Sequence, residues 1–233
     1  MKSLVVLNTR PREQAAELSG LLEQAGFSAI EAPAIAIVPA WDPVELEAVR
    51  RNLQAGAYSL VVLASQNGAH GLDAELRDVR VMCGAATAAA LGLEPLIALQ
   101  RFSAAAALDA IRAYLNRADR VLVPRAGEGR DELIDGLRAM DLNVDAPVAY
   151  RTVAVENARN RLLDGGIDVL TLCSPSAARS VADAVTGDVV VVCLGQTTAD
   201  AARTRGLRVD AVAANTSVPA LVAAFQTAVG VRA

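Results

Sequence analysis

Short runs of aliphatic and β-branched residues alternate along the chain with longer stretches rich in Ala, Leu and Arg. Apolar runs this short are typical of parallel strands that are buried on both faces. The runs predict strands at Leu4–Leu7, Ser28–Ala32, Ser59–Leu63, Arg80–Cys83, Leu96–Leu99, Arg120–Val123, Asn143–Ala146, Val169–Cys173, Val189–Leu194 and Val209–Ala213. The stretches between them predict helices at Pro11–Gln24, Pro43–Ala55, Gly68–Leu76, Ala86–Leu91, Ala104–Asn116, Arg130–Met140, Glu156–Asp164, Ser176–Ala184, Thr198–Arg205 and Pro219–Val229. The alternation indicates an α/β fold whose parallel sheets are flanked by helices.

The first half of the chain is similar to the second half. Three blocks recur in the same order at a separation of roughly 110 residues, which is typical of an internal repeat. The corresponding pairs are Arg10 and Arg125, Ser65 and Ser174, and Gly84 and Gly195. A single block could match by chance because all βα units look alike, but three together predict two similar lobes.

The boundary between the lobes has two interpretations. The simpler one divides the chain near Ala118. However, Pro33–Pro39 is an extended segment bounded by prolines, and Pro147–Val153 is its counterpart in the repeat. Two such strands could form an antiparallel ribbon through which the chain leaves one lobe and later returns. The residues alone leave both divisions open.

Composition excludes several classes of protein. The 233 residues carry 22 basic and 26 acidic side chains, a net charge of −4, and only 3% are aromatic. Proteins that bind nucleic acid normally show a basic surplus and stacking aromatics, so no nucleic-acid partner is expected. The longest uncharged stretches, 52–72 and 212–231, are interrupted by polar residues or by Gly and Pro, which predicts no membrane span. A strand follows Met-Lys-Ser directly, so no signal peptide is expected.

The rare residues restrict the chemistry further. His70 and Lys2 are the only histidine and lysine, so most familiar catalytic arrangements are absent. His70 is interpreted as solvent-facing or locally bonded. Cys83, Cys173 and Cys193 each lie in an apolar run, which predicts buried thiols and a cytoplasmic, reducing compartment. Neither a dinucleotide fingerprint nor a P-loop is present.

Small hydroxylated residues follow many of the predicted strands, where helices begin. In parallel α/β sheets ligands bind beyond the carboxyl ends of the strands, and free N–H groups at helix starts attract anions. The turns are Asn8–Pro11, Ser65–Asn67, Gly84–Thr87, Arg125–Arg130, Ser174–Ser176, Gly195–Thr198 and Asn215–Ser217. Each Ser or Thr could simply cap a helix. Their recurrence in both lobes favours a ligand with several negative charges.

The same turns carry a family resemblance across nearly the whole chain. The motifs are Thr9-Arg10-Pro11, the proline-bounded segment Pro33–Pro39, Ser65-Gln-Asn, Gly84-Ala-Ala-Thr87-Ala, LVPRAGEGR, Val148-Ala-Tyr150-Arg-Thr, Cys173-Ser-Pro-Ser176 and Gly195-Gln-Thr-Thr198-Ala. Each is short, but their number, order and spacing resemble the uroporphyrinogen-III synthase family.

The resemblance implies two flavodoxin-like, doubly wound lobes with parallel sheets, joined by a two-stranded β-ribbon. It implies that residues 1–36 and 151–233 form lobe 1 and that residues 37–150 form lobe 2, with linkers at about 33–39 and 147–153. It also implies a monomer that acts on a small molecule.

The implied substrate is hydroxymethylbilane, a linear tetrapyrrole with eight carboxylates, and the implied reaction needs no cofactor and no metal. Loss of the terminal hydroxyl gives an azafulvene, and attack by the last ring gives a spiro intermediate that rearranges with inversion of that ring. By analogy Tyr150 is the candidate general acid. The substrate-binding candidates are Thr9, Arg10, Ser65, Thr87, Arg125, Ser174, Thr197 and Thr198. A two-lobed module that binds a tetrapyrrole or another polyanion without converting it is the alternative.

Overall fold

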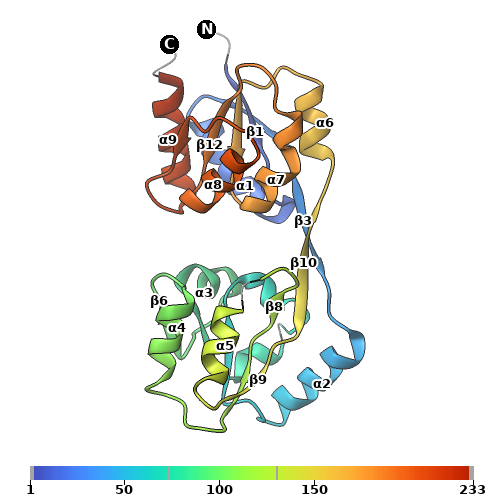
Figure 1. Cartoon of the computed structure of the whole chain (residues 1–233), viewed down its shortest axis with the longest axis vertical. Coiled ribbons are helices and arrows are strands. Elements are labelled where there is room, and N and C mark those ends of the chain that lie inside the picture. Colours follow the sequence, from blue (N-terminus) through green and yellow to red (C-terminus); the bar gives the residue numbers. More distant parts are fainter. Residues whose placement is uncertain (1–2, 73, 130, 231–233) are drawn as a thin grey trace. The chain divides into compact units, whose positions relative to one another are not determined.

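The computed structural model describes residues 3–72, 74–129 and 131–230. The chain forms two compact units. Unit 1 comprises Met1–Ala36 and Val153–Ala233, and unit 2 comprises Ile37–Thr152. Each unit is built on a five-stranded sheet with helices on both faces, as Figure 1 shows. The expected α/β class with parallel sheets is therefore confirmed, and Ala118 lies inside unit 2.

Unit 1 has the strand order β13-β12-β11-β1-β2, and all its pairs are parallel. The strands are β1 (Val5–Asn8), β2 (Ser28–Glu31), β11 (Val169–Leu172), β12 (Val190–Cys193) and β13 (Ala211–Val212). The helices are α1 (Arg12–Gln24), α6 (Asn157–Leu163), α7 (Pro175–Val181), α8 (Gln196–Thr204) and α9 (Val218–Gly230), with a short 3-10 helix η3 (Ala182–Ala184) after α7.

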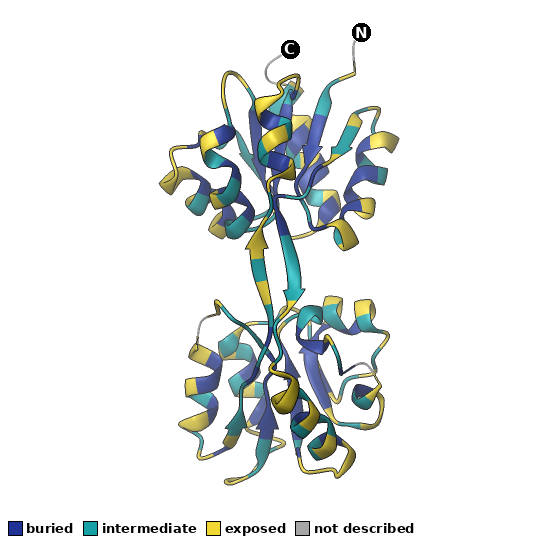
Figure 2. Ribbon diagram, turned by 90° about the vertical axis from the view of Figure 1, so that its right-hand side faces the viewer, coloured by how far each residue is buried: buried dark blue, intermediate teal, exposed yellow. Residues whose placement is uncertain are grey.

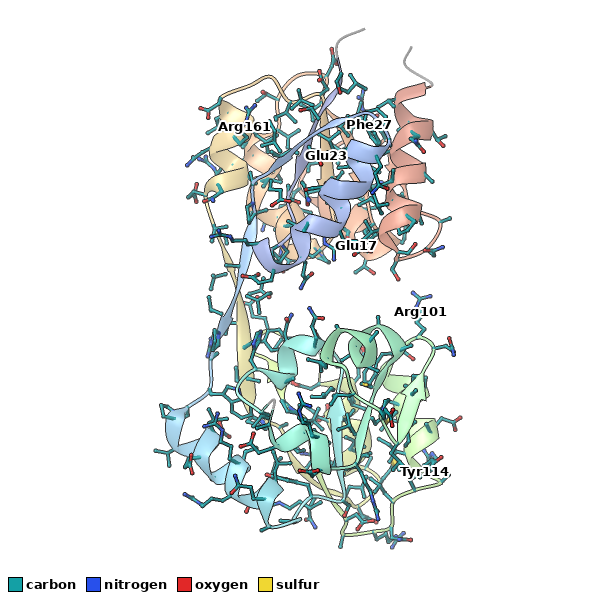
Figure 3. All side chains as sticks on the ribbon, turned by 180° about the vertical axis from the view of Figure 1, so that it is seen from behind. Glu17, Glu23, Phe27, Arg101, Tyr114 and Arg161 are labelled. Atoms are coloured by element: carbon teal, nitrogen blue, oxygen red, sulfur yellow. The ribbon has the colours of Figure 1, made fainter. Side chains whose placement is uncertain are left out.

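Alternate residues of these strands enter two separate cores, one on each face of the sheet. Val6 of β1 packs with α1 and α9, whereas its neighbour Leu7 packs with α6, α7 and α8. In the first core Phe27, labelled in Figure 3, packs edge to face against Phe225 of α9, with 4.4 Å between the ring centroids. Figure 2 shows the resulting concentration of buried residues on the strands. Burial on both faces explains why the strands appear in the sequence as continuous apolar runs.

Unit 2 has the strand order β6-β5-β4-β7-β9, again with parallel pairs. The strands are β4 (Leu60–Leu63), β5 (Val81–Gly84), β6 (Ile97–Leu99), β7 (Arg120–Leu122) and β9 (Asn143–Asp145). The helices are α2 (Pro43–Gln54), α3 (Ala85–Leu91), α4 (Ala104–Ile111) and α5 (Glu132–Arg138), with 3-10 helices η1 (Gln66–Ala69) and η2 (Glu75–Asp78). Placing β7 on β1 and β9 on β2 makes the two sheet orders identical, as the repeat requires.

A third sheet contains the two extended segments that join the units. Its order is β3-β10-β8, where β3 spans Ile35–Pro39, β10 spans Val148–Ala154 and β8 spans Arg125–Ala126. Near its two ends, Ala40 N–H donates to Ala149 and Val155 N–H donates to Ala34, so β3 and β10 run antiparallel. The third strand, β8, was not expected, because two residues give no periodic pattern.

The expected helix Gly68–Leu76 is wrong. The segment instead contains η1 and η2, separated by Gly71 at φ +79°. Glycine weakens a helix by about 1 kcal/mol relative to alanine. Two side chains hold the open loop in place, one from α2 and one from the segment just before it. Trp41 Nε1 donates to the carbonyl oxygen of His70, and the guanidinium of Arg50 donates to the carbonyl oxygen of Gly71.

Other differences are changes of boundary. Helix α4 ends at Ile111 and not at Asn116, and the last strand of unit 1 covers only Ala211–Val212. Arg130, the expected first residue of a helix, lies outside the described residues, as does Lys2. Within the parts of the chain that the structure describes, no helix combines the length and the apolar character needed to cross a bilayer.

Candidate functional site

A pocket of about 740 Å³ lies at the carboxyl ends of the strands of unit 2. Its wall comes from the segments that follow β4, β6 and β7, from the start of α5, and from β10. The polar side chains in the wall are Ser65, Arg101, Ser103, Arg125, Glu132 and Tyr150, and Phe102, Leu133 and Ile134 are among the apolar ones. Figure 3 shows Arg101 projecting from the loop after β6. This size and this mixture of groups suit an organic anion.

Tyr150 enters the pocket from β10 at an irregular position of the third sheet. Val148 pairs with Arg125 and Tyr150 pairs with Ala126, so two steps along β10 match one step along β8. The N–H of Gly127 donates to the carbonyl of Tyr150 at 2.8 Å. Such a bulge redirects the side chains beside it, and bulges are common next to functional sites.

Tyr150 and Ser65 both line this pocket. Burial raises the pKa of Tyr150 above its ordinary value, and the influence of the Ser65 side chain opposes that shift. The phenol is therefore protonated at neutral pH and can act as a proton donor. Ser65 follows β4 in extended conformation, and its Oγ accepts a hydrogen bond from the N–H of Asn67 at 3.2 Å.

Two glycines allow the backbone to approach closely around this pair. A Cβ on Gly68 would lie 2.9 Å from the carbonyl oxygen of Pro124, so only glycine lets η1 contact the end of β7. A Cβ on Gly127 would lie 3.0 Å from Cγ of Arg151. Both approaches bring the β4, β7 and β10 segments together at one edge of the sheet.

Arg125 lies in the pocket wall with its charge already compensated. Its Nη1 is 2.7 Å from Oδ1 of Asp131. Thr87, the remaining candidate in unit 2, is in the first turn of α3 and is half-buried.

In unit 1 the candidates follow β1, β11 and β12. Thr9 is fully buried, and its Oγ1 donates to the carbonyl of Thr171 at 2.6 Å, which joins β1 to β11. Ser174 caps α7 by accepting a hydrogen bond from the N–H of Ala177 at 3.1 Å. In α8, Thr197 is exposed and Thr198 is only 4% exposed. None of the described side chains caps the start of α8.

Arg10 differs from these residues because part of its charge is buried without compensation. Among the described residues, its Nη1 is the buried side-chain nitrogen or oxygen that lacks a hydrogen-bond partner, while Nη2 makes a long contact of 3.5 Å with Gln14. Burial raises the pKa of the nearby Cys173 thiol to about 11, and the positive charge of Arg10 opposes the shift. A buried guanidinium nitrogen without an acceptor is costly and favours an incoming anion.

Asn8 holds Arg10 in place, a role that the sequence motif did not reveal. Its side-chain amide donates to the carbonyl of Ala15 and to Oγ of Ser19, and its Oδ1 accepts from the N–H of Arg10 at 3.2 Å. The only sequence signal is a polar residue at the end of an apolar strand. Asn8 is fully buried, so its hydrogen bonds fix the turn that presents Arg10.

A second pocket, of about 760 Å³, lies at the amino ends of β4 and β5 in unit 2. Two of its polar side chains, Tyr58 and Ser59, already bind residues beyond the described lining. The hydroxyl of Tyr58 donates to Asp145 at 2.7 Å, and Arg120 pairs with the same carboxylate while lying over the Tyr58 ring. Burial, and then the bond to Asp145, raise the pKa of Tyr58 to about 12. The described lining of this pocket includes none of the predicted site residues.

Comparison with known proteins gives one consistent family. The model of the family described as uroporphyrinogen-III synthase HemD matches residues 16–223. The porphyrin biosynthesis protein HemD of Ruminiclostridium josui is 27% identical over 225 residues, which cover 87% of this chain and 44% of that protein. The chain therefore spans less than half the length of this curated relative.

Solved structures show the same fold. A mutant uroporphyrinogen III synthase from the extremely thermophilic bacterium Thermus thermophilus is 17% identical and superposes with a TM-score of 0.59, covering 98% of this chain and 99% of that one. The uroporphyrinogen-III synthetase of Helicobacter pylori is 14% identical with a TM-score of 0.60, covering 97% and 99%. At these identities the likeness concerns the fold alone.

Proposed function

The chain belongs to the uroporphyrinogen-III synthase HemD family, and on that premise we propose that it closes hydroxymethylbilane into uroporphyrinogen III, with inversion of the last pyrrole ring and release of water. The observation that carries the proposal is the pocket at the carboxyl ends of the unit 2 strands, where a protonated phenol lies among groups suited to an anion. A site for this reaction needs a proton donor for the departing hydroxyl and groups that hold the carboxylates of the substrate.

The proposed chemical role of Tyr150 is that of general acid. Its phenol gives a proton to the departing hydroxyl of the substrate, so that water leaves and not hydroxide. The electron pair that expels this group comes from the pyrrole nitrogen, which agrees with a site that offers one proton donor and few other reactive groups. The remaining task of the protein is to hold the flexible chain so that ring inversion precedes closure.

The proposed carboxylate-binding groups are Arg10, Thr87, Ser174, Thr197 and Thr198. The buried and unpaired Nη1 supports Arg10 most strongly. We leave Thr9 out, because its hydroxyl is buried and already donates to Thr171. Arg125 is given the secondary role of shaping the pocket wall, since Asp131 compensates its charge.

A small-molecule substrate is the partner that this proposal requires. The net charge of −4 does not favour a nucleic-acid partner. The monomeric state and the cytoplasmic setting, which the sequence led us to expect, stay predictions.

The test is an isomer assay. The protein is incubated with freshly prepared hydroxymethylbilane, the product is oxidised to porphyrin, and isomers I and III are separated by chromatography. Isomer III is expected, because the free substrate closes without ring inversion and gives isomer I. A protein that yields only isomer I, at the rate of a protein-free control, would contradict the proposal and favour a binding module.

A further inference from the structure

Arg101 differs from the other polar side chains of the unit 2 pocket because its charge has no partner. It lines the pocket and is exposed. In the parts of the chain that the structure describes, its guanidinium makes neither an ion pair nor a hydrogen bond. Figure 3 shows the side chain extending from the loop that follows β6. A guanidinium offers five N–H donors in a planar fork, which fits the two oxygens of a carboxylate.

Other polar groups of this wall are already engaged. Ser65 and Ser103 each accept a hydrogen bond from the backbone N–H of a residue that follows in the chain. The charge of Arg125 is compensated by a carboxylate 2.7 Å away, and Glu132 is engaged in an interaction of its own. Among the described residues of the wall, the guanidinium of Arg101 is therefore the positive charge that is left for a ligand.

The backbone that carries Arg101 is fixed on both sides. Strand β6 ends at Leu99, two residues before it. The next residue, Phe102, is partly buried and packs against the core between the sheet and α4 and α5. A Cβ on Gly84 would lie 3.3 Å from Cβ of Phe102, so glycine at the end of β5 lets the loop lie close to the sheet. Ser103 then caps α4. These contacts hold the start of the Arg101 side chain at the pocket wall.

The same wall offers an apolar surface beside this charge. Its members come from the loop before α4 and from the start of α5, and are Phe102, Leu133 and Ile134. The two segments lie close together because Gly136 of α5 leaves room for Leu108 of α4. A cation beside apolar side chains matches a pyrrole unit, whose ring packs against hydrocarbon and whose carboxylate arms pair with a guanidinium.

We propose, resting on the function above, that Arg101 is a specificity-determining residue of the unit 2 pocket: its guanidinium pairs with a carboxylate arm of the pyrrole unit that the pocket receives. It takes part in no bond-making step and selects the ligand by its charge. The sequence gave no reason to choose Arg101, because an isolated arginine in an exposed loop has no periodic or repeated pattern.

Four variants isolate the charge. Arg101→Lys keeps the charge but loses the planar fork, Arg101→Gln removes the charge and Arg101→Glu reverses it. Arg112→Gln is the matched control, because Arg112 is an exposed arginine just after α4, lies outside the described lining of the pocket and loses the same charge. Thermal unfolding of each variant checks the fold. No change in melting temperature is expected at Arg101, whose side chain has no described partner to lose.

The first measurement is binding and does not depend on turnover. A porphyrin with eight carboxylates, the oxidised form of the proposed product, is titrated into the protein and its fluorescence is followed. We expect Kd to rise about threefold to tenfold in Arg101→Gln, between the effects of an exposed ion pair and of a charged hydrogen bond. The rise should be larger in Arg101→Glu and smaller in Arg101→Lys, and it should shrink as salt is added.

Three results of this titration would overturn the proposal. They are an unchanged Kd in Arg101→Gln, an equal rise in Arg112→Gln, and no saturable binding by the original protein. An equal rise in the control would mean that only the overall charge of the unit matters.

The second measurement separates binding from chemistry in the isomer III assay. We expect KM for hydroxymethylbilane to rise in Arg101→Gln by the same factor as Kd, while kcat stays within about twofold of the original, as for a lost interaction that is equal in ground state and transition state. A residue with only a structural role would instead lower the melting temperature and would not follow the order Lys, Gln, Glu. A fall in kcat with an unchanged KM would contradict the proposal.

The two failures are distinguishable. If the original protein makes no isomer III, the proposed function fails, and the porphyrin titration still decides whether Arg101 binds a carboxylate. If isomer III forms but Kd and KM are unchanged in Arg101→Gln, the proposed function stands and this inference fails.

Discussion

Arg10 of unit 1 and Arg125 of unit 2 occupy corresponding positions of the repeat, directly after the equivalent strands β1 and β7. Their surroundings differ. Nη1 of Arg10 is buried without a partner among the described residues, whereas Nη1 of Arg125 lies 2.7 Å from Asp131. Arg125 also belongs to β8, a short strand that has no counterpart in the described segment after β1. The repeat therefore preserves the backbone position of the arginine, but not whether its guanidinium is paired with a carboxylate.

The same contrast extends to the ribbon. Tyr150 on β10 corresponds in the repeat to Ala36 on β3, so the phenol is present on one side of the repeat only. Ser65 and Ser174 correspond as well, and each accepts a hydrogen bond from a backbone N–H. Of these two serines, it is Ser65 that lines a pocket together with a phenol. One unit therefore holds the candidate proton donor and the other holds the buried, uncompensated guanidinium.

Tyr150→Phe should have the largest effect on this division of roles. The ring remains and preserves packing, but the proton donor is lost. General-acid assistance contributes about 10²–10⁴-fold, and we expect a loss of about a hundredfold, at the lower limit, because the pyrrole nitrogen already assists ionisation. Isomer III should form slowly enough for spontaneous isomer I to compete. A folded variant with the original rate would remove the acid from the mechanism.

Arg10→Gln and Arg125→Gln test the comparison directly. A hydrogen bond to a charged group contributes about 1.5–3 kcal/mol, so Arg10→Gln should lower kcat/KM about tenfold or more. Arg125→Gln should change it less than about threefold, because its charge is already paired. Steady-state kinetics measure both.

Thermal stability should rank the same two variants in the reverse order, with Arg125→Gln losing more stability than Arg10→Gln. Arg10→Gln removes an uncompensated buried charge and should leave the melting temperature unchanged or raise it. Arg125→Gln loses a partly exposed ion pair, which contributes at most about 1 kcal/mol. Equal kinetic losses in the two variants would show that the repeat preserves function at this position after all.

Ser174→Ala and Thr198→Ala compare two hydroxyls at helix starts within unit 1. If both bind carboxylates, kcat/KM should fall severalfold in each. Ser174 accepts a capping hydrogen bond, so its loss should lower the free energy of unfolding by about 1 kcal/mol. Unchanged kinetics for Thr198→Ala, measured with the melting curve of the same sample, would remove Thr198 from the binding set.

Thr9→Val should have the smallest effect on activity. Valine fills the same space, and the lost bond to Thr171 leaves a buried carbonyl with one partner fewer. We expect a loss of about 1–3 kcal/mol in unfolding free energy and a rate within about twofold of the original. Thr197→Val, at an exposed position, is the matched control and should leave stability unchanged. A large kinetic loss in Thr9→Val would return Thr9 to the site.

The sheet strands were predictable because both of their faces are covered, so nearly every residue is apolar. Leu60–Leu63 and Val190–Cys193 are buried at each position. Strand β8 gave no such signal. The helix predicted across Gly68 and Gly71 failed because those glycines serve contacts with Pro124 and with Arg50, which are distant in the sequence.

The site was predictable as a set of turns but not in its detail. A motif shows that Thr9 and Arg10 are adjacent, but not that one hydroxyl faces the neighbouring strand while one guanidinium nitrogen is left unpaired. The placement of Ser65 and Tyr150 in one pocket wall goes with the bulge in β10 and with the close approach of Gly68 to Pro124. Both features arise from tertiary packing, which local sequence does not encode.

The insertion of unit 2 between β3 and β10 sets the order in which the protein can fold during synthesis. Unit 2 is continuous, so its sheet is complete once residue 152 has left the ribosome. Strand β1 cannot complete its pairing until later, because its neighbour β11 begins with Val169. The N–H of Val5 likewise donates to the carboxylate of Asp168, 163 positions further along the chain. Until then β1 presents an unpaired apolar edge, the kind of edge that promotes aggregation. Nascent chains halted before Val169 should therefore depend on chaperones more than the finished protein does.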